Sequence, residues 1–122
     1  MRIKRDPLDI LFSQYMRLKA DGICEKCLRW VGYGKLQTSH LFGRRYKALR
    51  YDEENVSTLC FSCHQHFHEQ PVEHILWFTE RHGQQAIDLL QARARVTYPK
   101  PDKVLIELSL RERIKQIKEV LE

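Results

Sequence analysis

The four cysteines constrain this chain more than any other feature of its sequence. They form two C-x2-C pairs, Cys24/Cys27 and Cys60/Cys63, with 32 residues between the pairs, and no cysteine is left over. Two such pairs are typical of a tetrahedral four-cysteine zinc site. A disulfide framework belongs to secreted chains, and a redox C-x-x-C needs only one pair in a thioredoxin-like context. The spacing therefore predicts one structural zinc ion bound by all four thiolates.

Length indicates one small domain, and the charge distribution is compatible with a polyanionic partner. The chain has 122 residues, 43% of them hydrophobic and 30% charged, so its core is modest. Residues 1–50 hold twelve Lys and Arg against four Asp and Glu, whereas residues 51–122 hold nine against twelve. A basic half suggests nucleic acid, because Lys and Arg neutralise phosphates, although basic residues that only keep the surface soluble explain the charge equally well.

The apolar segments do not suggest a membrane protein. No apolar run approaches the length of a membrane span, and the short N-terminal apolar stretch is interrupted by Asp9. A secretory signal peptide is therefore not expected, and we expect an intracellular, cytoplasmic protein encoded by a bacterium or a phage.

Hydrophobic spacing and punctuating Pro and Gly residues predict the elements of the fold. Two short strands are expected at 35–40 and 45–50, forming a hairpin around Gly43. Helices are expected at 7–20, 61–69, 71–83, 84–96 and 102–122. The linker at 97–103 divides an expected main domain, 1–96, from the C-terminal segment, 97–122. We interpret the last helix as docked on the core, with a homodimerisation helix as the alternative.

A second pattern lies inside the span between the cysteine pairs. His40, Asn55, His64 and His68 follow one another with the spacing H-x14-N-x8-H-x3-H. His40 at a strand end could take a proton from water near a phosphate, and Asn55 could orient that imidazole through its side-chain carbonyl. His64 and His68 share one helix face, so that they could bind a metal ion together. Taken alone, each residue has an ordinary explanation in packing or capping, and the combination favours catalysis.

The segments "TSHLFGRRY" and "ENVSTLCFSCHQHFH" resemble the HNH (His-Asn-His, ββα-metal, or His-Me finger) endonucleases that carry a four-cysteine zinc site. The resemblance covers residues 24–68. It implies an α+β fold, in which this small ββα-metal core is flanked by an N-terminal helix and several C-terminal helices. It also implies His40 as general base, Asn55 as its orienting residue, and His64 with His68 at a catalytic Mg²⁺, Mn²⁺ or other divalent ion.

Further residues refine the resemblance. In most HNH domains the residue before the general base is an Asp or His metal ligand, but Ser39 stands there in this chain. More weakly, residues 74–95 are similar to the phage recombination nucleases of the NinG/Rap type. Four basic residues follow the proposed base and are expected to contact DNA phosphates, unless they are simply a solvated charge run: Arg44, Arg45, Lys47 and Arg50.

Four aromatic residues in the same region are expected to pack in the core and around the zinc site. They are Trp30, Tyr33, Phe42 and Tyr46, and a base-stacking role for one of them is the alternative. His66 faces away from His64 and His68 on the same helix, so we expect it to be exposed and inert.

These features together predict a metal-dependent HNH endonuclease. We expect it to nick double-stranded or branched DNA, in phage recombination or packaging, and the resemblance implies that it leaves 3′-hydroxyl and 5′-phosphate ends. The alternative is a zinc-ribbon DNA-binding module without catalysis. A third possibility is an adaptor whose C-terminal helix recruits a protein partner.

Overall fold

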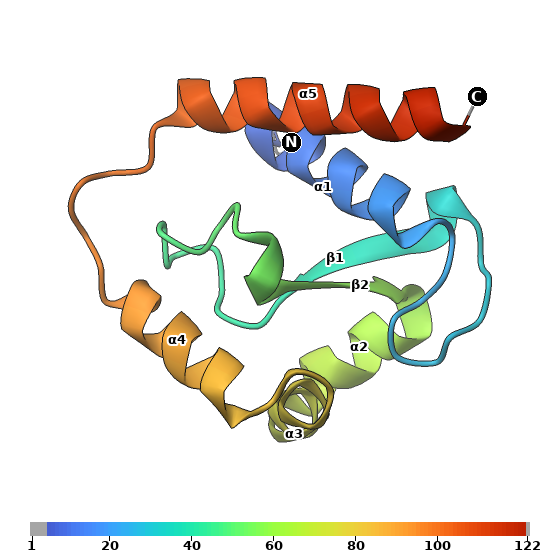
Figure 1. Ribbon diagram of the computed structural model, residues 1–122. Helices are drawn as coiled ribbons and strands as arrows, with labels where there is room; N and C mark the ends of the chain where they lie inside the picture. Colours follow the sequence, from blue (N-terminus) through green and yellow to red (C-terminus); the bar gives the residue numbers. More distant parts are fainter. Residues whose placement is uncertain (1–4, 122) are drawn as a thin grey trace, which may run out of the picture.

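The computed structural model describes residues 5–121 and has a mixed α+β fold (Figure 1). In this part of the chain, five α-helices and two 3-10 turns surround a sheet of only two strands. In chain order the elements are α1 (Pro7–Ala20), η1 (Tyr33–Lys35), β1 (Leu36–His40), η2 (Glu53–Asn55), β2 (Val56–Cys60), α2 (Phe61–Glu69), α3 (Pro71–His82), α4 (Gln84–Ala94) and α5 (Lys103–Leu121).

Local signals explain where the helices begin and end, and the five helices expected from the sequence are confirmed. At the start of α1 the Asp6 side chain accepts a hydrogen bond of 2.8 Å from the Leu8 N–H. At its end, Asp21 adopts the left-handed conformation and caps the helix. Gly83, with a φ of 89°, separates α3 from α4. The predicted end of the last helix at residue 122 lies outside the described residues.

The second strand differs from the prediction. We expected residues 45–50 to pair with the first strand, but β1 pairs antiparallel with β2, where Leu36 lies opposite Cys60 and His40 opposite Val56. All five residues of β2 are buried, because helices cover both faces of the sheet. A strand that is buried on both faces has no polar alternation, so "VSTLC" does not carry the usual strand pattern. Residues 41–52 instead form a loop of turns.

The two-stranded sheet lies between two helical layers (Figure 1). On one side, Val56 packs with α1 and α5 in a cluster that includes Phe12, Leu110 and Ile114. On the other side, Leu59 packs with Phe67 of α2, and a third cluster joins the loop residue Leu49 to α3 and α4. The interpretation of the last helix as docked on the core is therefore confirmed.

The four aromatic residues expected in the core divide into two pairs. Phe42 and Tyr46 pack beside the Leu49 cluster, as predicted. Trp30 and Tyr33 are exposed, so the prediction that they pack in the core is wrong. In the segment from the first cysteine pair to β1, Val31 packs against the cluster of Leu59 and Phe67, whereas Trp30 and Tyr33 belong to none of the three hydrophobic clusters. None of the helices between residues 5 and 121 is both long and apolar enough to span a membrane.

Candidate metal centre and histidine site

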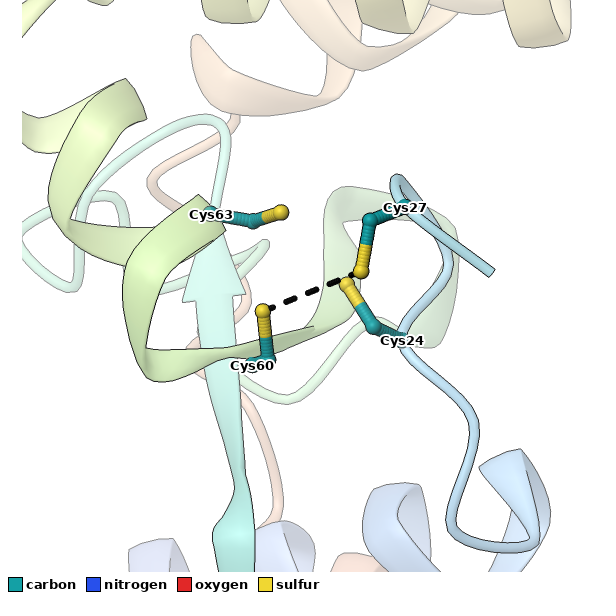
Figure 2. Close-up of side chains that lie close together, drawn as sticks. All are labelled: Cys24, Cys27, Cys60 and Cys63. Carbon is teal, nitrogen blue, oxygen red and sulfur yellow. Dashed lines mark hydrogen bonds between the residues drawn. The ribbon is translucent and has the colours of Figure 1, made fainter. Parts of the chain in front are cut away.

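Figure 2 shows the four cysteine side chains pointing toward one another from two separate segments. Cys24 and Cys27 lie on the turn that follows α1, whereas Cys60 ends β2 and Cys63 lies in the first turn of α2. The four Sγ atoms all lie within 4.8 Å of one another, and none of the cysteines forms a disulfide. The Cys27 and Cys60 Sγ atoms are 3.9 Å apart. A tetrahedral zinc ion with bonds of about 2.3 Å needs sulfur atoms about 3.8 Å apart, so the cluster can hold such an ion.

Neighbouring groups stabilise thiolates in this cluster. Arg29 Nε donates to Cys27 Sγ over 3.4 Å and lowers the pKa of that thiol to about 6. Burial opposes ionisation of Cys60, but hydrogen bonds from Cys63 at the start of α2 outweigh it, and the pKa falls below its usual value. Burial and the neighbouring thiols raise the pKa of Cys63. Without a cation, the four thiols cannot all ionise, because the negative charges of neighbouring thiolates repel one another. A divalent cation bound among them would offset this repulsion and stabilise the thiolate forms.

The ring of His40 is oriented by the backbone of the loop that follows β1. Its Nε2 lies 2.9 Å from the Arg50 carbonyl oxygen, which can only accept a hydrogen bond. Nε2 therefore carries a proton, and in the neutral ring Nδ1 keeps its lone pair. Burial lowers the pKa of His40, although the bond to the carbonyl opposes this effect. His40 is therefore a neutral imidazole near pH 7 with one nitrogen able to accept a proton.

His64 is oriented in a similar way by a side chain of β1. Its Nδ1 lies 2.5 Å from Gln37 Oε1, so that Nδ1 donates and Nε2 is the nitrogen left with a lone pair. Burial and the charge of His68 lower the pKa of His64. His68 is exposed one turn further along α2. A neutral imidazole with a fixed tautomer is the form that binds metal ions, and Gln37 is the partner that fixes it.

The structure does not bring His40 and His64 onto the same face of the sheet. Because side chains alternate along a strand, Gln37 and Ser39 point toward α2, whereas His40 points toward α1, where its ring lies 6.1 Å from that of Phe12. β1 is an edge strand, so side chains from both faces of the sheet could reach a ligand bound at its free edge.

The histidines of α2 do not form a three-ligand metal site by themselves. Within residues 5–121 the cysteine cluster is the only group of three or more His, Cys, Asp or Glu side chains close enough to hold a metal ion. His64 and His68 therefore offer two ligands, and Ser39 adds no His, Asp or Glu at the position before His40. His66 is exposed, as expected, and is hydrogen-bonded to Glu73.

The Asn55 side chain is hydrogen-bonded to the loop that follows β1 and not to the His40 ring. We expected its side-chain carbonyl at the His40 ring, but Oδ1 accepts a bond of 2.8 Å from the Phe42 N–H. Nδ2 donates to the carbonyls of Phe42, at 2.9 Å, and Leu49, at 3.2 Å. Asn55 is completely buried, so these three bonds satisfy a side chain that has no access to water. It orients His40 only indirectly, since the same loop carries Arg50.

The four basic residues expected at DNA divide into two kinds. Arg44, Arg45 and Lys47 are exposed on the loop that Asn55 holds. Arg50 instead forms a two-point ion pair with Asp9 of α1: Nε donates to Oδ1 over 3.0 Å, and Nη2 donates to Oδ2. Burial raises the pKa of Asp9, but Arg50 outweighs this effect and the pKa lies below its usual value. Arg50 therefore joins the loop to α1 and is less available to phosphate than the other three.

Sequence reasoning did not identify three of the groups that define this site. They are Gln37, the Arg50 carbonyl and Arg29, which bind His64, His40 and Cys27 respectively. Only Gln37 had a usable signal, because it stands two positions before Ser39 on the same face of a predicted strand. Comparison with known proteins gives no match: no family model, no curated protein and no solved structure matches this chain.

Proposed function

We propose that this protein is a metal-dependent endonuclease of the HNH type, which hydrolyses phosphodiester bonds in DNA. The observation that carries the proposal is the pair of neutral, oriented histidines on either side of β1. His40 has an Nδ1 lone pair suited to a general base, and His64 has an Nε2 lone pair suited to a metal ion. The zinc ion at the four cysteines is structural in this proposal, since it joins the turn after α1 to the first turn of α2.

The proposed chemistry begins with proton transfer to His40. Its Nδ1 removes a proton from water, and the resulting hydroxide attacks phosphorus as the bond to the 3′-oxygen breaks. The 3′-oxygen takes a proton from solvent, which leaves a 3′-hydroxyl on one fragment and a 5′-phosphate on the other. One active site per chain cuts one strand, so a monomer nicks the duplex.

His64 and His68 would hold the catalytic cation. A divalent ion bound there would stabilise the negative charge that develops on the phosphate and on the leaving oxygen. Imidazole nitrogen is a better ligand for Mn²⁺ and later transition metals than for Mg²⁺, which prefers oxygen. With two histidines and no acidic residue at Ser39, the ligand set favours Mn²⁺ over Mg²⁺.

The loop between β1 and η2 would contact the DNA backbone. Arg44, Arg45 and Lys47 are exposed next to His40 in sequence, and three positive charges on one loop attract phosphates. Asn55 fixes the loop on which they lie. Double-stranded or branched DNA is the substrate class that we propose for this surface.

A plasmid-nicking assay with Mn²⁺ tests the proposal. The protein and its His40→Ala variant are compared, with His66→Ala as the matched control, because His66 is an exposed histidine of α2 that bonds only to Glu73 among the described residues. We expect His40→Ala to slow nicking by about 100-fold or more, the usual contribution of a general base, and His66→Ala to nick normally. Equal nicking by the protein and His40→Ala would refute the mechanism.

A zinc-ribbon DNA-binding module is the second candidate. The observation that favours it is the absence, within residues 5–121, of any group of three metal-binding side chains besides the cysteines. A binding module would retain DNA affinity but cut nothing with either Mg²⁺ or Mn²⁺. The same assay, combined with a gel-shift measurement, therefore separates the two functions.

A further inference from the structure

The indole of Trp30 is more exposed than the other large hydrophobic side chains next to the cysteines, Leu28 and Phe61. Trp30 is 74% exposed, although a tryptophan usually buries most of its surface. It lies three residues after Cys27, on the turn that connects the first cysteine pair to β1. Single exposed hydrophobic side chains are common on protein surfaces, and Trp30 differs from the others in lying on the turn beside the cysteines with basic residues around it.

Two glycines shape the space beside this indole. A Cβ atom at Gly22 would lie 2.7 Å from Trp30 Nε1, and a Cβ at Gly32 would lie 3.5 Å from Cη2. Both glycines have positive φ, 79° and 85°, a conformation that other residues rarely adopt. The side of the ring that carries Nε1 and Cη2 thus lies close to these two glycines, and most of the residue's surface is exposed to solvent.

The backbone around Trp30 is held by the same turn that holds the cysteines. Ile23 and Trp30 form an antiparallel bridge, and the Val31 N–H donates to the Gly22 carbonyl at 2.8 Å. The Cys24 N–H donates to the Arg29 carbonyl at 3.0 Å. Because a metal ion at the cysteines would fix Cys24 and Cys27, it would also fix the position of the indole. A ring that is already fixed loses little conformational entropy when a ligand stacks on it.

The charges of the neighbouring residues indicate what kind of ligand this ring would meet. Lys26, Arg29 and Lys35 are exposed in the same segment. Residues 22–35 contain one acidic residue, Glu25, which is engaged by the Thr58 N–H and by Arg81, and a second one, Asp21, is exposed directly before Gly22. A cationic surface with one open aromatic ring suits a strand that has phosphates and unpaired bases, because every base offers a flat face for stacking.

We infer that Trp30 is a stacking platform for an unpaired base of a nucleic-acid strand. The inference rests on the proposed function in taking nucleic acid as the ligand, and it narrows the substrate to DNA with an unpaired segment, such as a branch, flap or gap. In a continuous duplex the bases are stacked on one another and offer no free face to Trp30. Lys26 and Lys35 would contact the phosphates on either side of the stacked base.

Fluorescence anisotropy with a labelled oligothymidylate and a labelled duplex tests the inference. Trp30→Ala should weaken binding of the single strand about 10-fold, since stacking on one aromatic ring commonly contributes that much, and should change duplex binding less than about 2-fold. Trp30→Phe should recover part of the loss. Tyr98→Ala is the matched control, because Tyr98 is an 85% exposed aromatic residue on the linker before α5, and it should bind both ligands normally.

Other outcomes separate this inference from the nuclease proposal. Unchanged single-strand affinity in Trp30→Ala, or an equal loss for both ligands, would overturn the inference. A change in sedimentation instead of DNA affinity would also overturn it and assign the ring to a protein contact. If the wild type binds single strands through Trp30 but His40→Ala and the wild type nick plasmids equally, only the nuclease mechanism fails. A zinc measurement on Trp30→Ala checks that the cysteine cluster is intact.

Discussion

Replacing Asn55 by alanine should destabilise the protein strongly, although its side chain is hydrogen-bonded to neither the cysteines nor the His40 ring. The side chain is completely buried and makes three hydrogen bonds, two to Phe42 and one to the Leu49 carbonyl. Each hydrogen bond contributes about 1 kcal/mol to stability, and a buried partner that is left without any hydrogen bond costs more than that. Asn55→Ala should therefore lower the free energy of unfolding by about 3 kcal/mol, a large share of the ~5–15 kcal/mol typical of a domain.

Urea unfolding with zinc in excess measures this loss. With an m-value of about 1.5 kcal/mol/M, a loss of about 3 kcal/mol moves the midpoint down by about 2 M. Gln84→Ala is the control, because this exposed amide bonds only to Asp88 one turn away and should cost less than about 0.5 kcal/mol. Asn55→Asp should be no better than alanine, since a buried carboxylate cannot donate to the two carbonyls. A loss below about 1 kcal/mol in Asn55→Ala would refute the role of Asn55 in holding the loop.

Four further predictions concern the charges and ligands of the site. Burial lowers the pKa of His40 below its unfolded value. Its contribution to stability is therefore complete above about pH 6.5 and is lost as the pH falls through the folded pKa. The free energy of unfolding should be lower at pH 5 than at pH 7, and His40→Gln should reduce this difference. The rate of nicking should rise with pH through that same pKa, because only the neutral ring accepts a proton. Elemental analysis should find one zinc ion per chain that is lost in Cys60→Ala and kept in His64→Ala, and loss in both would place the zinc elsewhere. Arg50→Met should cost about 2 kcal/mol in urea unfolding, because it leaves Asp9 buried without its partner, and no loss would show that this ion pair is not needed.

Much of the fold could be predicted because its signals are local. Each helix begins or ends at a residue whose chemistry acts within one turn, such as Asp6 before Pro7 or Gly83 between α3 and α4. The cysteine cluster was predictable for a similar reason, since C-x2-C places two thiolates on one short turn. The second strand was missed because its five residues are buried between two helical layers and show no alternation.

The sequence by itself determined the residue types that the site can use: four thiolates for a metal ion, two histidines one turn apart on a helix, and a basic half that suits phosphates. Only the tertiary structure decided how these groups are held. The acceptor for His40 is the backbone carbonyl of Arg50, and the Asn55 side chain bonds to the backbone of Phe42 and Leu49. Every residue has a carbonyl, so no letter of the sequence marks the one that will orient a ring. Likewise, the sequence suggests Arg50 as a phosphate ligand, but in the fold it pairs with Asp9 of α1. These two residues are 41 positions apart, so their pairing depends on the path of the chain between them.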